Sequence, residues 1–185
     1  MKDMFSKFVP WKIMRFLCLN PTTEVYVQEL SRKLHLSAGM CSSVLKELEA
    51  SGMVSSRELG KAHYYKLSDN YLTRALKQLV ISHLISTSGL VDGLRELHPG
   101  ALSVVLYGSY AHGDYMEGSD MDILIIGPGG GRTAAGSTRT EKELGIEVNV
   151  MVIGTGQWSQ MGRKGDPFYQ EVMNGHIVLD GGALP

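Results

Sequence analysis

The stretch LYGSYAHGDYMEGSDMDILI, residues 106–125, places a Gly-Ser pair and an Asp-Met-Asp triplet between two apolar segments. A strand that ends at Gly108 and Ser109 and leads into a helix leaves backbone N–H groups without helical partners at the turn. These groups and the Ser109 hydroxyl suit an anionic phosphate. Glycine also allows a phosphate to approach the backbone closely. The turn therefore predicts a phosphate-binding site.

Two carboxylates, Asp120 and Asp122, stand at the start of the second apolar segment. Residues two apart in a strand point to the same side of a sheet, so Met121 and Ile123 should face the core on the other side. Neighbouring carboxylates repel each other unless a cation lies between them. A hard cation such as Mg²⁺ takes oxygen ligands and usually shares its shell with the phosphates of a substrate. The turn and the carboxylates therefore predict two halves of one nucleoside triphosphate site.

Ten residues separate Ser109 from Asp120, which gives the pattern G-S-x10-D-x-D within GSYAHGDYMEGSDMD. This pattern resembles that of the DNA polymerase beta-type nucleotidyltransferase superfamily and is most similar to its minimal nucleotidyltransferases. The likeness covers about residues 101–181, including the tail segment DPFYQEVMNGHIVL. The resemblance implies ATP or another nucleoside triphosphate as substrate and two Mg²⁺ ions as cofactors. It also implies in-line attack of an acceptor hydroxyl on the α-phosphorus, with pyrophosphate as the leaving group.

The resemblance also assigns roles to single residues. It implies that Asp120 and Asp122 are catalytic metal ligands. The implied nucleotide-binding residues are Gly108, Ser109, His112 and Ser119. Relatives often carry arginine at the place of His112, and histidine is charged only part of the time near neutral pH. His112 is therefore either a phosphate partner or a surface polar residue, and Tyr107 and Tyr110 beside the turn are expected to pack.

Relatives generally have a third carboxylate on a later strand, where it serves as a metal ligand and as a base for the acceptor hydroxyl. The matching strand here is IEVNVMVI, residues 146–153, and Asn149 occupies the place of that carboxylate. Asparagine can coordinate a metal through its carbonyl oxygen but cannot accept a proton at neutral pH. Glu147, two residues earlier on the same face, is the candidate substitute. If Glu147 does not reach, the site would bind a nucleotide and turn over slowly or not at all.

Residues 101–185 are expected to form the nucleotidyltransferase domain, an α/β unit with a small mixed sheet. Strands are predicted at 103–107, 120–126, 145–153 and 176–180, and helices near 155–162 and 167–174. The Gly-rich segment GPGGGRTAAGSTRT, residues 127–140, is expected to be a mobile loop. No Gly-Lys-Ser/Thr follows its glycines, so the spacing excludes a P-loop.

Residues 1–70 predict three helices followed by a hairpin. The first two helices fit residues 10–20 and 26–34. Ser37 is a good N-cap for a third helix, in which apolar residues recur at helical spacing. These apolar residues are Cys41, Val44, Leu45 and Leu48. The segment MVSSRELGKAHYYKL, residues 53–67, has the pattern of a two-stranded hairpin with a polar tip. This order is the layout of a winged helix-turn-helix.

The segments VQELSRKLHLSAGMCSSVLKELEASGMV and HYYKLS resemble the ArsR/MarR-like winged-helix regulators over roughly residues 8–68. The resemblance implies binding of double-stranded DNA through residues 37–64. The candidate DNA-binding residues are Met40, Ser42, Ser43 and Lys46 on the third helix and Arg57 and Lys61 on the wing. The alternative is a protein-docking or dimerisation module, in which these side chains are ordinary solvated residues.

Residues 71–100 are expected to form a helical connector. The pattern over residues 70–97 fits one long helix or two, with Ser-Thr-Ser-Gly at 86–89 as the candidate break. A helix after the wing often serves as a dimer interface in such regulators, which makes a homodimer the expected assembly. The alternative is a connector that only packs on both domains.

Composition indicates a globular protein, with 43% hydrophobic and 20% charged residues. The sequence contains no recognisable signal peptide or long apolar span, so we expect a cytoplasmic protein without a membrane partner. Residues 1–70 carry ten Lys/Arg and seven Asp/Glu, or +3, and residues 71–185 carry eight and twelve, or −4, which together give the net −1. This basic excess is weak support for a nucleic-acid partner. Cys18 and Cys41 lack a metal-ligand spacing and are interpreted as buried thiols.

The expected fold class is α+β, with an N-terminal winged helix-turn-helix, a helical connector and a C-terminal nucleotidyltransferase domain. The first functional hypothesis is transfer of AMP from ATP to a hydroxyl, with a tyrosine or serine of a partner protein as a candidate acceptor, as in toxin–antitoxin pairs. The second hypothesis is a DNA-binding transcriptional regulator whose C-terminal domain senses a nucleotide with little or no catalysis. In a third, the winged helix binds no DNA and only docks the acceptor.

Overall fold

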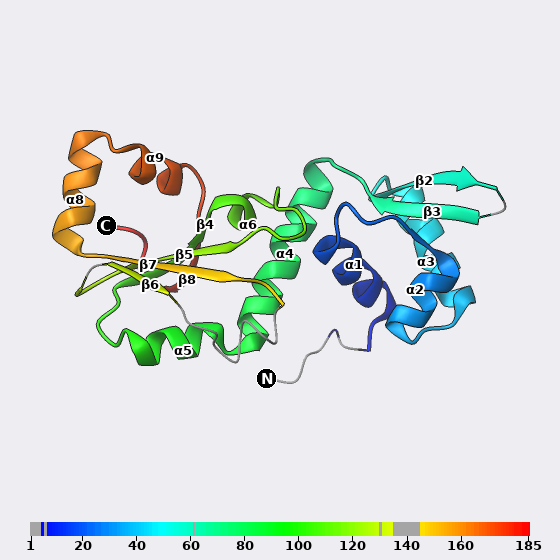
Figure 1. Cartoon of the computed structure of the whole chain (residues 1–185), viewed down its shortest axis with the longest axis horizontal. Helices are drawn as coiled ribbons and strands as arrows, with labels where there is room; N and C mark the ends of the chain where they lie inside the picture. The colour runs from blue at the N-terminus through cyan, green and yellow to red at the C-terminus, as the bar shows by residue number, and fades with distance from the viewer. Residues whose placement is uncertain (1–4, 6, 61, 130, 135–144) are drawn as a thin grey trace. The chain divides into compact units, whose positions relative to one another are not determined.

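The computed structural model describes residues 5, 7–60, 62–129, 131–134 and 145–185, with the backbone alone for 131–134. The chain divides into two compact units, Met1–Val80 and Ile81–Pro185, and Figure 1 colours it from one end to the other. Helix α4, Tyr71–Ser88, crosses the boundary between the units. The expected division into three parts at residues 70 and 100 stays a prediction.

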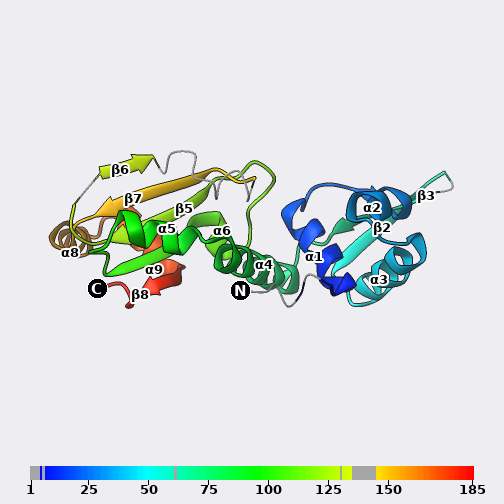
Figure 2. The same ribbon diagram turned by 90° about the horizontal axis from the view of Figure 1, so that it is seen from below.

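In unit 1 the described residues form helices and a small antiparallel sheet (Figure 2). The elements are α1 (Val9–Leu19), β1 (Val25–Tyr26), α2 (Val27–Leu34), α3 (Ala38–Ala50), β2 (Val54–Leu59) and β3 (Ala62–Leu67), followed by the first part of α4. The sheet has the order β1-β3-β2. The three predicted helices and the hairpin are therefore confirmed. Strand β1 was not predicted from the sequence, because two residues are too few to show an alternating pattern.

Helix α3 begins where the sequence predicts, because the Ser37 side chain accepts a hydrogen bond from the backbone N–H of Met40 at 3.2 Å. Its apolar stripe faces the core, with Val44 partly buried and the other three members buried. The buried core of unit 1 further includes Trp11, Ile13, Leu17, Cys18, Val25, Leu30, Val54, Tyr65, Leu67 and Val80. Both cysteines are buried free thiols, as predicted, and burial raises the pKa of Cys18 to about 12.

In unit 2 the described strands form one mixed sheet with the order β6-β7-β5-β4-β8. The elements after α4 are α5 (Leu90–Leu97), β4 (Ser103–Tyr107), α6 (Gly108–His112), β5 (Met121–Ile126), β6 (Gly131–Ala134), β7 (Val148–Ile153), α8 (Thr155–Lys164), α9 (Pro167–Asn174) and β8 (Ile177–Gly181). Figure 1 shows α8 and α9 on one side of this sheet and α5 on the other. Helices on both faces explain why every residue of β4 is buried.

Two strand predictions need correction. The predicted loop 127–140 contains β6, which pairs antiparallel with β7 from Gly131↔Val152 to Ala134↔Asn149. Backbone pairing to a sheet edge does not need an alternating apolar pattern, so the Gly-rich composition concealed this strand. Residues 130 and 135–144 of that prediction lie outside the described residues. Strand β7 also begins at Val148 rather than at residue 145.

An ion pair joins α5 to β8. Arg95 donates hydrogen bonds to both carboxylate oxygens of Asp180, with Nε 2.6 Å from Oδ2. These hydrogen bonds raise the pKa of Arg95 and lower the pKa of Asp180, because they favour the charged forms. Since the Asp180 pKa is lowered on folding, the pair stabilises the fold at neutral pH. That contribution is lost as the pH falls through the lowered pKa.

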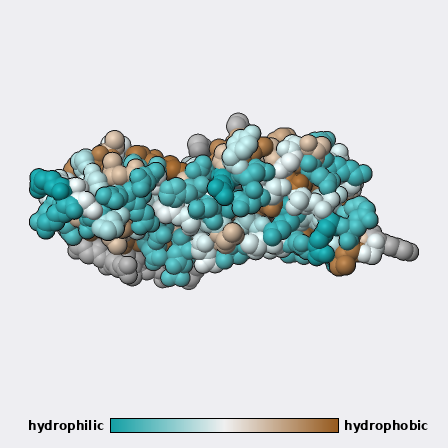
Figure 3. All heavy atoms as spheres, turned by 90° about the horizontal axis from the view of Figure 1, so that it is seen from above, coloured by the Kyte–Doolittle hydropathy of each residue, from teal (hydrophilic) through white to brown (hydrophobic). Residues whose placement is uncertain are grey.

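On the face drawn in Figure 3 hydrophilic residues predominate, and apolar residues form scattered patches. The exposed large apolar side chains include Tyr71, Leu97 and Leu59, which are 86%, 61% and 57% exposed. Over the described part of the chain, no helix combines the length and the apolar character that crossing a membrane requires.

We predict that Ser37→Ala lowers the free energy of unfolding by about 1 kcal/mol, because the Met40 N–H at the start of α3 loses its side-chain acceptor. Ser37→Asp keeps an acceptor and should lose much less. Urea unfolding followed by the helical circular dichroism signal measures both variants. An unchanged unfolding midpoint for Ser37→Ala would show that the cap contributes nothing.

Candidate functional site

The pairing of β4 with β5 brings the Gly-Ser turn close to the carboxylate of Asp122. The two strands are antiparallel, and Tyr107 lies opposite Asp122. Gly108 follows Tyr107 with a φ of +69°, in the left-handed region that side chains disfavour. A Cβ at Gly108 would lie 3.1 Å from Oδ2 of Asp122. The backbone of the turn and the Asp122 carboxylate therefore converge, as the sequence predicts.

The pairing of β5 with β7 adds a third polar side chain. These strands are parallel neighbours, and Asn149 lies beside Asp122. The side-chain amide of Asn149 donates a hydrogen bond to Oδ2 of Asp120 at 3.3 Å. Asp120 and Asn149 are exposed and Asp122 is half-buried, whereas Met121 and Ile123 are fully buried. The alternation predicted from the sequence is confirmed, and one end of two neighbouring strands carries two carboxylates and an amide.

Glu147 precedes β7 and is exposed. Its backbone carbonyl accepts a hydrogen bond from the Met121 N–H at 2.8 Å, which holds it at the start of β5. The structure gives its carboxylate no ion pair with any described residue. The role of Glu147 as a substitute base stays a prediction.

Within the described ranges, no group of three or more His, Cys, Asp or Glu is arranged to hold a metal ion. The donors at this site are instead two carboxylates and the amide of Asn149, which can supply a carbonyl oxygen. An all-oxygen set fits a hard divalent cation, and Mg²⁺ usually takes only one or two carboxylates and completes its shell with water and phosphate oxygens. The residues present therefore fit Mg²⁺ bound together with a nucleotide.

Tyr110 holds the loop that leads to Asp120. Its hydroxyl donates a hydrogen bond to the carbonyl of Ser119 at 3.2 Å, and its ring stacks on Tyr115 with centroids 4.2 Å apart. Burial raises the pKa of Tyr110 to about 12, and the negative charge of Asp120 acts in the same direction. The sequence predicts packing for Tyr110, and the stacking on Tyr115 agrees with it. Its contact with Ser119 was missed because no local pattern links residues nine apart across a loop.

The other predicted nucleotide-binding residues lie in α6 and in the following loop. The Ser109 carbonyl accepts a hydrogen bond from the Asp114 N–H at 3.1 Å. The Ser119 hydroxyl accepts one from the Met116 N–H at 3.0 Å. The ring of His112 packs so closely on Gly175, after α9, that a Cβ there would overlap its Nε2. Nucleotide contacts by Ser109, His112 and Ser119 stay predictions.

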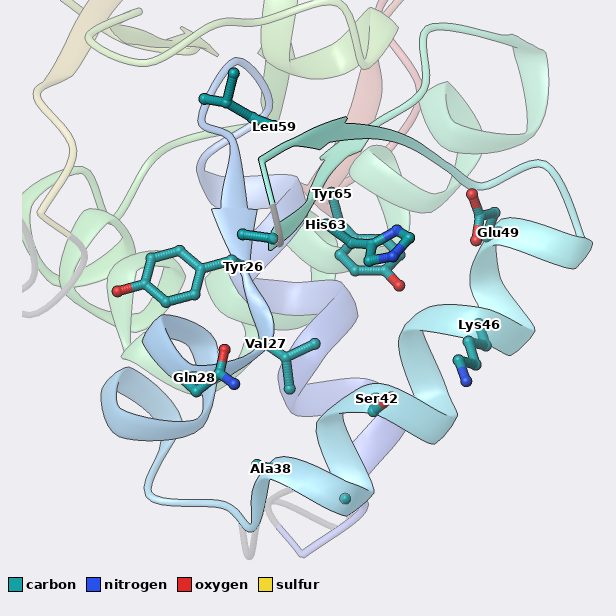
Figure 4. A pocket seen from close by; sticks show the side chains of 12 residues that line it. Tyr26, Val27, Gln28, Ala38, Ser42, Lys46, Glu49, Leu59, His63 and Tyr65 are labelled. Atoms are coloured by element: carbon teal, nitrogen blue, oxygen red, sulfur yellow. The ribbon is translucent and has the colours of Figure 1, made fainter.

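A groove of about 860 Å³ separates α3 from the hairpin in unit 1 (Figure 4). Its lining comprises Tyr26, Val27, Gln28, Ala38, Gly39, Ser42, Lys46, Glu49, Leu59, Ala62, His63 and Tyr65. Ser42 and Lys46, predicted to contact DNA, therefore line this groove. Met40 and Ser43 are exposed on α3 but lie outside the lining. Of the four residues of α3 that are predicted to contact DNA, two therefore face the groove and two lie outside it.

Of the two wing residues that are predicted to contact DNA, the structure describes only Arg57. Arg57 is bound by Glu24 through Nε–Oε1 and Nη2–Oε2 distances of 2.9 and 2.5 Å, and its guanidinium lies over the Tyr64 ring. These hydrogen bonds raise the pKa of Arg57 and lower the pKa of Glu24. Lys61 lies outside the described residues. The charge of Arg57 is therefore already compensated within the protein.

A family model described as "Nucleotidyltransferase domain" matches residues 88–171. The matched segment contains the Gly108 turn, Asp120, Asp122 and Asn149. It covers less than half of the chain. This segment is therefore similar to nucleotidyltransferase domains.

A curated relative, "Putative protein adenylyltransferase MJ0604" of Methanocaldococcus jannaschii, is 50% identical over 38 residues. These residues make up 20% of this chain and 38% of the relative, so the chain spans little more than a third of that relative's length.

Two solved structures are among those to which the chain shows a partial likeness. Reduced HlyU from Vibrio cholerae is 24% identical, with 50% of this chain and 79% of that chain covered and a TM-score of 0.33. A toxin–antitoxin crystal structure with AMP-PNP is 19% identical, with 52% of this chain and 74% of that chain covered and a TM-score of 0.38. Both TM-scores are too low for these likenesses to carry an inference.

We predict that Gly108→Ala weakens binding of Mg²⁺–AMP-PNP about tenfold or more, equivalent to about 1.4 kcal/mol, because the new Cβ displaces the Asp122 carboxylate. Gly118→Ala is the matched control, since Gly118 has a φ of +80° but no neighbour within 4 Å of a Cβ. Both variants should lose about 1–2 kcal/mol of stability from backbone strain. Titration calorimetry measures the affinities, and equal affinities in the two variants would contradict the prediction.

Proposed function

We propose that unit 2 transfers a nucleoside monophosphate, AMP from ATP, to a hydroxyl group. The observation that carries this proposal is the convergence of the Gly108 turn and Asp122, beside Asp120 and Asn149. A turn whose glycine has a positive φ and which lies next to carboxylates is suited to a triphosphate and the cation that accompanies it. The family match over residues 88–171 supports the same chemistry.

Each residue has a defined task in this proposal. The backbone at Gly108 and the hydroxyl of Ser109 bind the triphosphate, with Ser119 and His112 as further nucleotide contacts. Asp120 and Asp122 hold Mg²⁺, which when bound neutralises charge on the triphosphate. The hydroxyl oxygen of the acceptor forms the new bond to the α-phosphorus, and the bond to pyrophosphate breaks. The proton of the hydroxyl passes to Glu147 or to water, since Asn149 cannot accept it.

The acceptor in this proposal is a tyrosine or serine hydroxyl of a partner protein. The support is the relative from Methanocaldococcus jannaschii, which is described as a "Putative protein adenylyltransferase". In this respect the protein would act in the manner of an antitoxin that modifies its partner.

The second candidate function is a DNA-binding regulator that senses a nucleotide through a weakly active or inactive unit 2. Asn149 favours it, because the resemblance expects a carboxylate at this place, and the amide found there donates a hydrogen bond to Asp120. Unit 1 has three helices followed by a hairpin, the order of a winged helix-turn-helix. In this role Met40, Ser42, Ser43 and Lys46 would meet the DNA, and a homodimer would double the contacts. Arg57 would join them only by leaving Glu24.

We predict that the chain, incubated with radiolabelled ATP, Mg²⁺ and a cell lysate, transfers label to a protein. Asp122→Ala should reduce the transfer about 100-fold or more, since it removes a metal ligand. Asp92→Ala, which removes an exposed carboxylate on α5, is the control and should retain transfer. Mg²⁺–ATP binding without any transfer, together with a specific DNA footprint, would support the sensor instead.

We predict that Asn149→Asp raises the rate of label transfer about 100-fold, the lower end of the usual contribution of a positioned base. The new carboxylate would supply a proton acceptor and a third metal ligand beside Asp120. Asn149→Ser, which provides neither charge nor base, serves as the control. If wild type and Asn149→Asp transfer label at the same rate, Glu147 already fills the role, and Glu147→Gln should then abolish transfer.

A further inference from the structure

A second cavity in unit 1, of about 380 Å³, lies on α1 and the last residues of α2. Its lining comprises Trp11, Lys12, Arg15, Phe16, Leu19, Asn20, Lys33 and Leu34. It shares no lining residue with the groove beside α3. Its volume falls in the range of sites for small organic molecules, about 300–1,000 Å³. Neither the DNA-binding nor the nucleotidyl-transfer proposal uses it.

Helix α1 has one face that packs in the core and another face that lines the cavity. Ile13, Leu17 and Cys18 are fully buried on the core face. Four lining residues recur at i, i+3, i+4 and i+7 on another face, namely Lys12, Arg15, Phe16 and Leu19. This face combines an apolar floor with two cations that repel each other across one turn of helix. An anionic partner would relieve this repulsion.

The charged side chains that line the cavity are all positive. It includes three cations and no acidic residue. Lys33 is paired with Glu29 at 3.1 Å and lies 5.5 Å from the centroid of the Phe16 ring. Across the described residues, the structure gives Lys12 and Arg15 no ion pair. These two unit charges, which have no ion pair among the described residues, outweigh the opposing partial charges of nearby helix C-termini, about half a charge each.

The floor of the cavity is apolar. Trp11 is only 5% exposed, and Phe16, Leu19 and Leu34 are half-buried. The side-chain amide of Asn20 donates to the Phe16 carbonyl at 2.7 Å, which satisfies one of the carbonyls at the end of α1. A bare phosphate would leave the apolar floor unused, and an uncharged molecule would leave the cations unpaired. The lining therefore matches a molecule with both features.

We propose that this cavity binds a small organic anion, with an apolar body against Phe16, Leu19 and Leu34 and an acidic group at Lys12 and Arg15. Such a ligand binds the folded form of unit 1 and stabilises it by mass action. The proposal is independent of nucleotidyl transfer, because it concerns residues of unit 1 alone.

Fluorescence titration with anilinonaphthalene sulfonate, an aromatic anion, tests the proposal on the full chain. Uncharged phenyl-naphthylamine is the comparison probe. The expected result is saturable binding of one sulfonate molecule per chain. Arg15→Gln should weaken it about threefold and the Lys12→Gln/Arg15→Gln double variant about tenfold, as loss of exposed charge contacts predicts. Binding of the uncharged probe should not change in these variants.

Two further variants separate the cavity from general surface charge. Arg74→Gln removes the same charge at a residue paired with Asp69 outside the cavity, and sulfonate affinity should stay unchanged. Leu19→Trp fills the cavity and should abolish binding although all its cations remain. Leu97→Trp, at an exposed position of α5, is the matched control and should bind like wild type. Circular dichroism verifies that each variant is folded.

Three results would overturn the proposal. The first is the absence of saturable sulfonate binding, and the second is equal sulfonate affinity in wild type and the folded double variant. The third is retained binding in folded Leu19→Trp. If the sulfonate fails but an acidic, leucine-containing peptide binds in an Arg15-dependent way, the surface is a protein-docking site and the small-anion proposal is wrong.

Discussion

The approach of the Gly108 backbone to the Asp122 carboxylate is the constraint on which the candidate site depends. Antiparallel pairing sets Tyr107 opposite Asp122, so the chain leaving β4 must pass that carboxylate. Position 108 has a positive φ, and any Cβ there would lie 3.1 Å from a carboxylate oxygen. Backbone conformation and available space therefore select glycine for two separate reasons. The shape of the turn and the position of the carboxylate are determined together.

Asn149 has opposite consequences for the stability and the chemistry of this site. A third carboxylate next to Asp120 and Asp122 would add repulsion, whereas an amide adds none and donates a hydrogen bond to Asp120. The same amide cannot take a proton from an acceptor hydroxyl. An amide at this position thus favours a site that is stable without a cation, and in the proposed reaction the proton would pass to Glu147 or to water. These opposite consequences are the physical reason why an enzyme and a nucleotide sensor are both proposed.

Charge compensation decides which cations of unit 1 are available to a ligand. Arg57 on the wing is bound by Glu24, and Lys33 is paired with Glu29. The groove beside α3 contains both Lys46 and Glu49. Lys12 and Arg15, in contrast, have no ion pair within the described part of the chain. Part of the basic excess of residues 1–70 is therefore open to an anion at α1, whereas the charge of Arg57 on the wing is already paired, which a count of charges could not reveal.

Local rules determined much of this protein from its sequence. The Ser37 cap, the hairpin, the Gly108 turn and the burial of Met121 and Ile123 follow from short-range stereochemistry and side-chain periodicity. Contacts between distant residues were decided only by the tertiary structure. The addition of β6 to β7, the hydrogen bonds of Tyr110 to Ser119 and Asn149 to Asp120, and the pairing of Arg57 with Glu24 belong here. Strand order and packing bring these groups together, and neither is encoded in the pattern of any single segment.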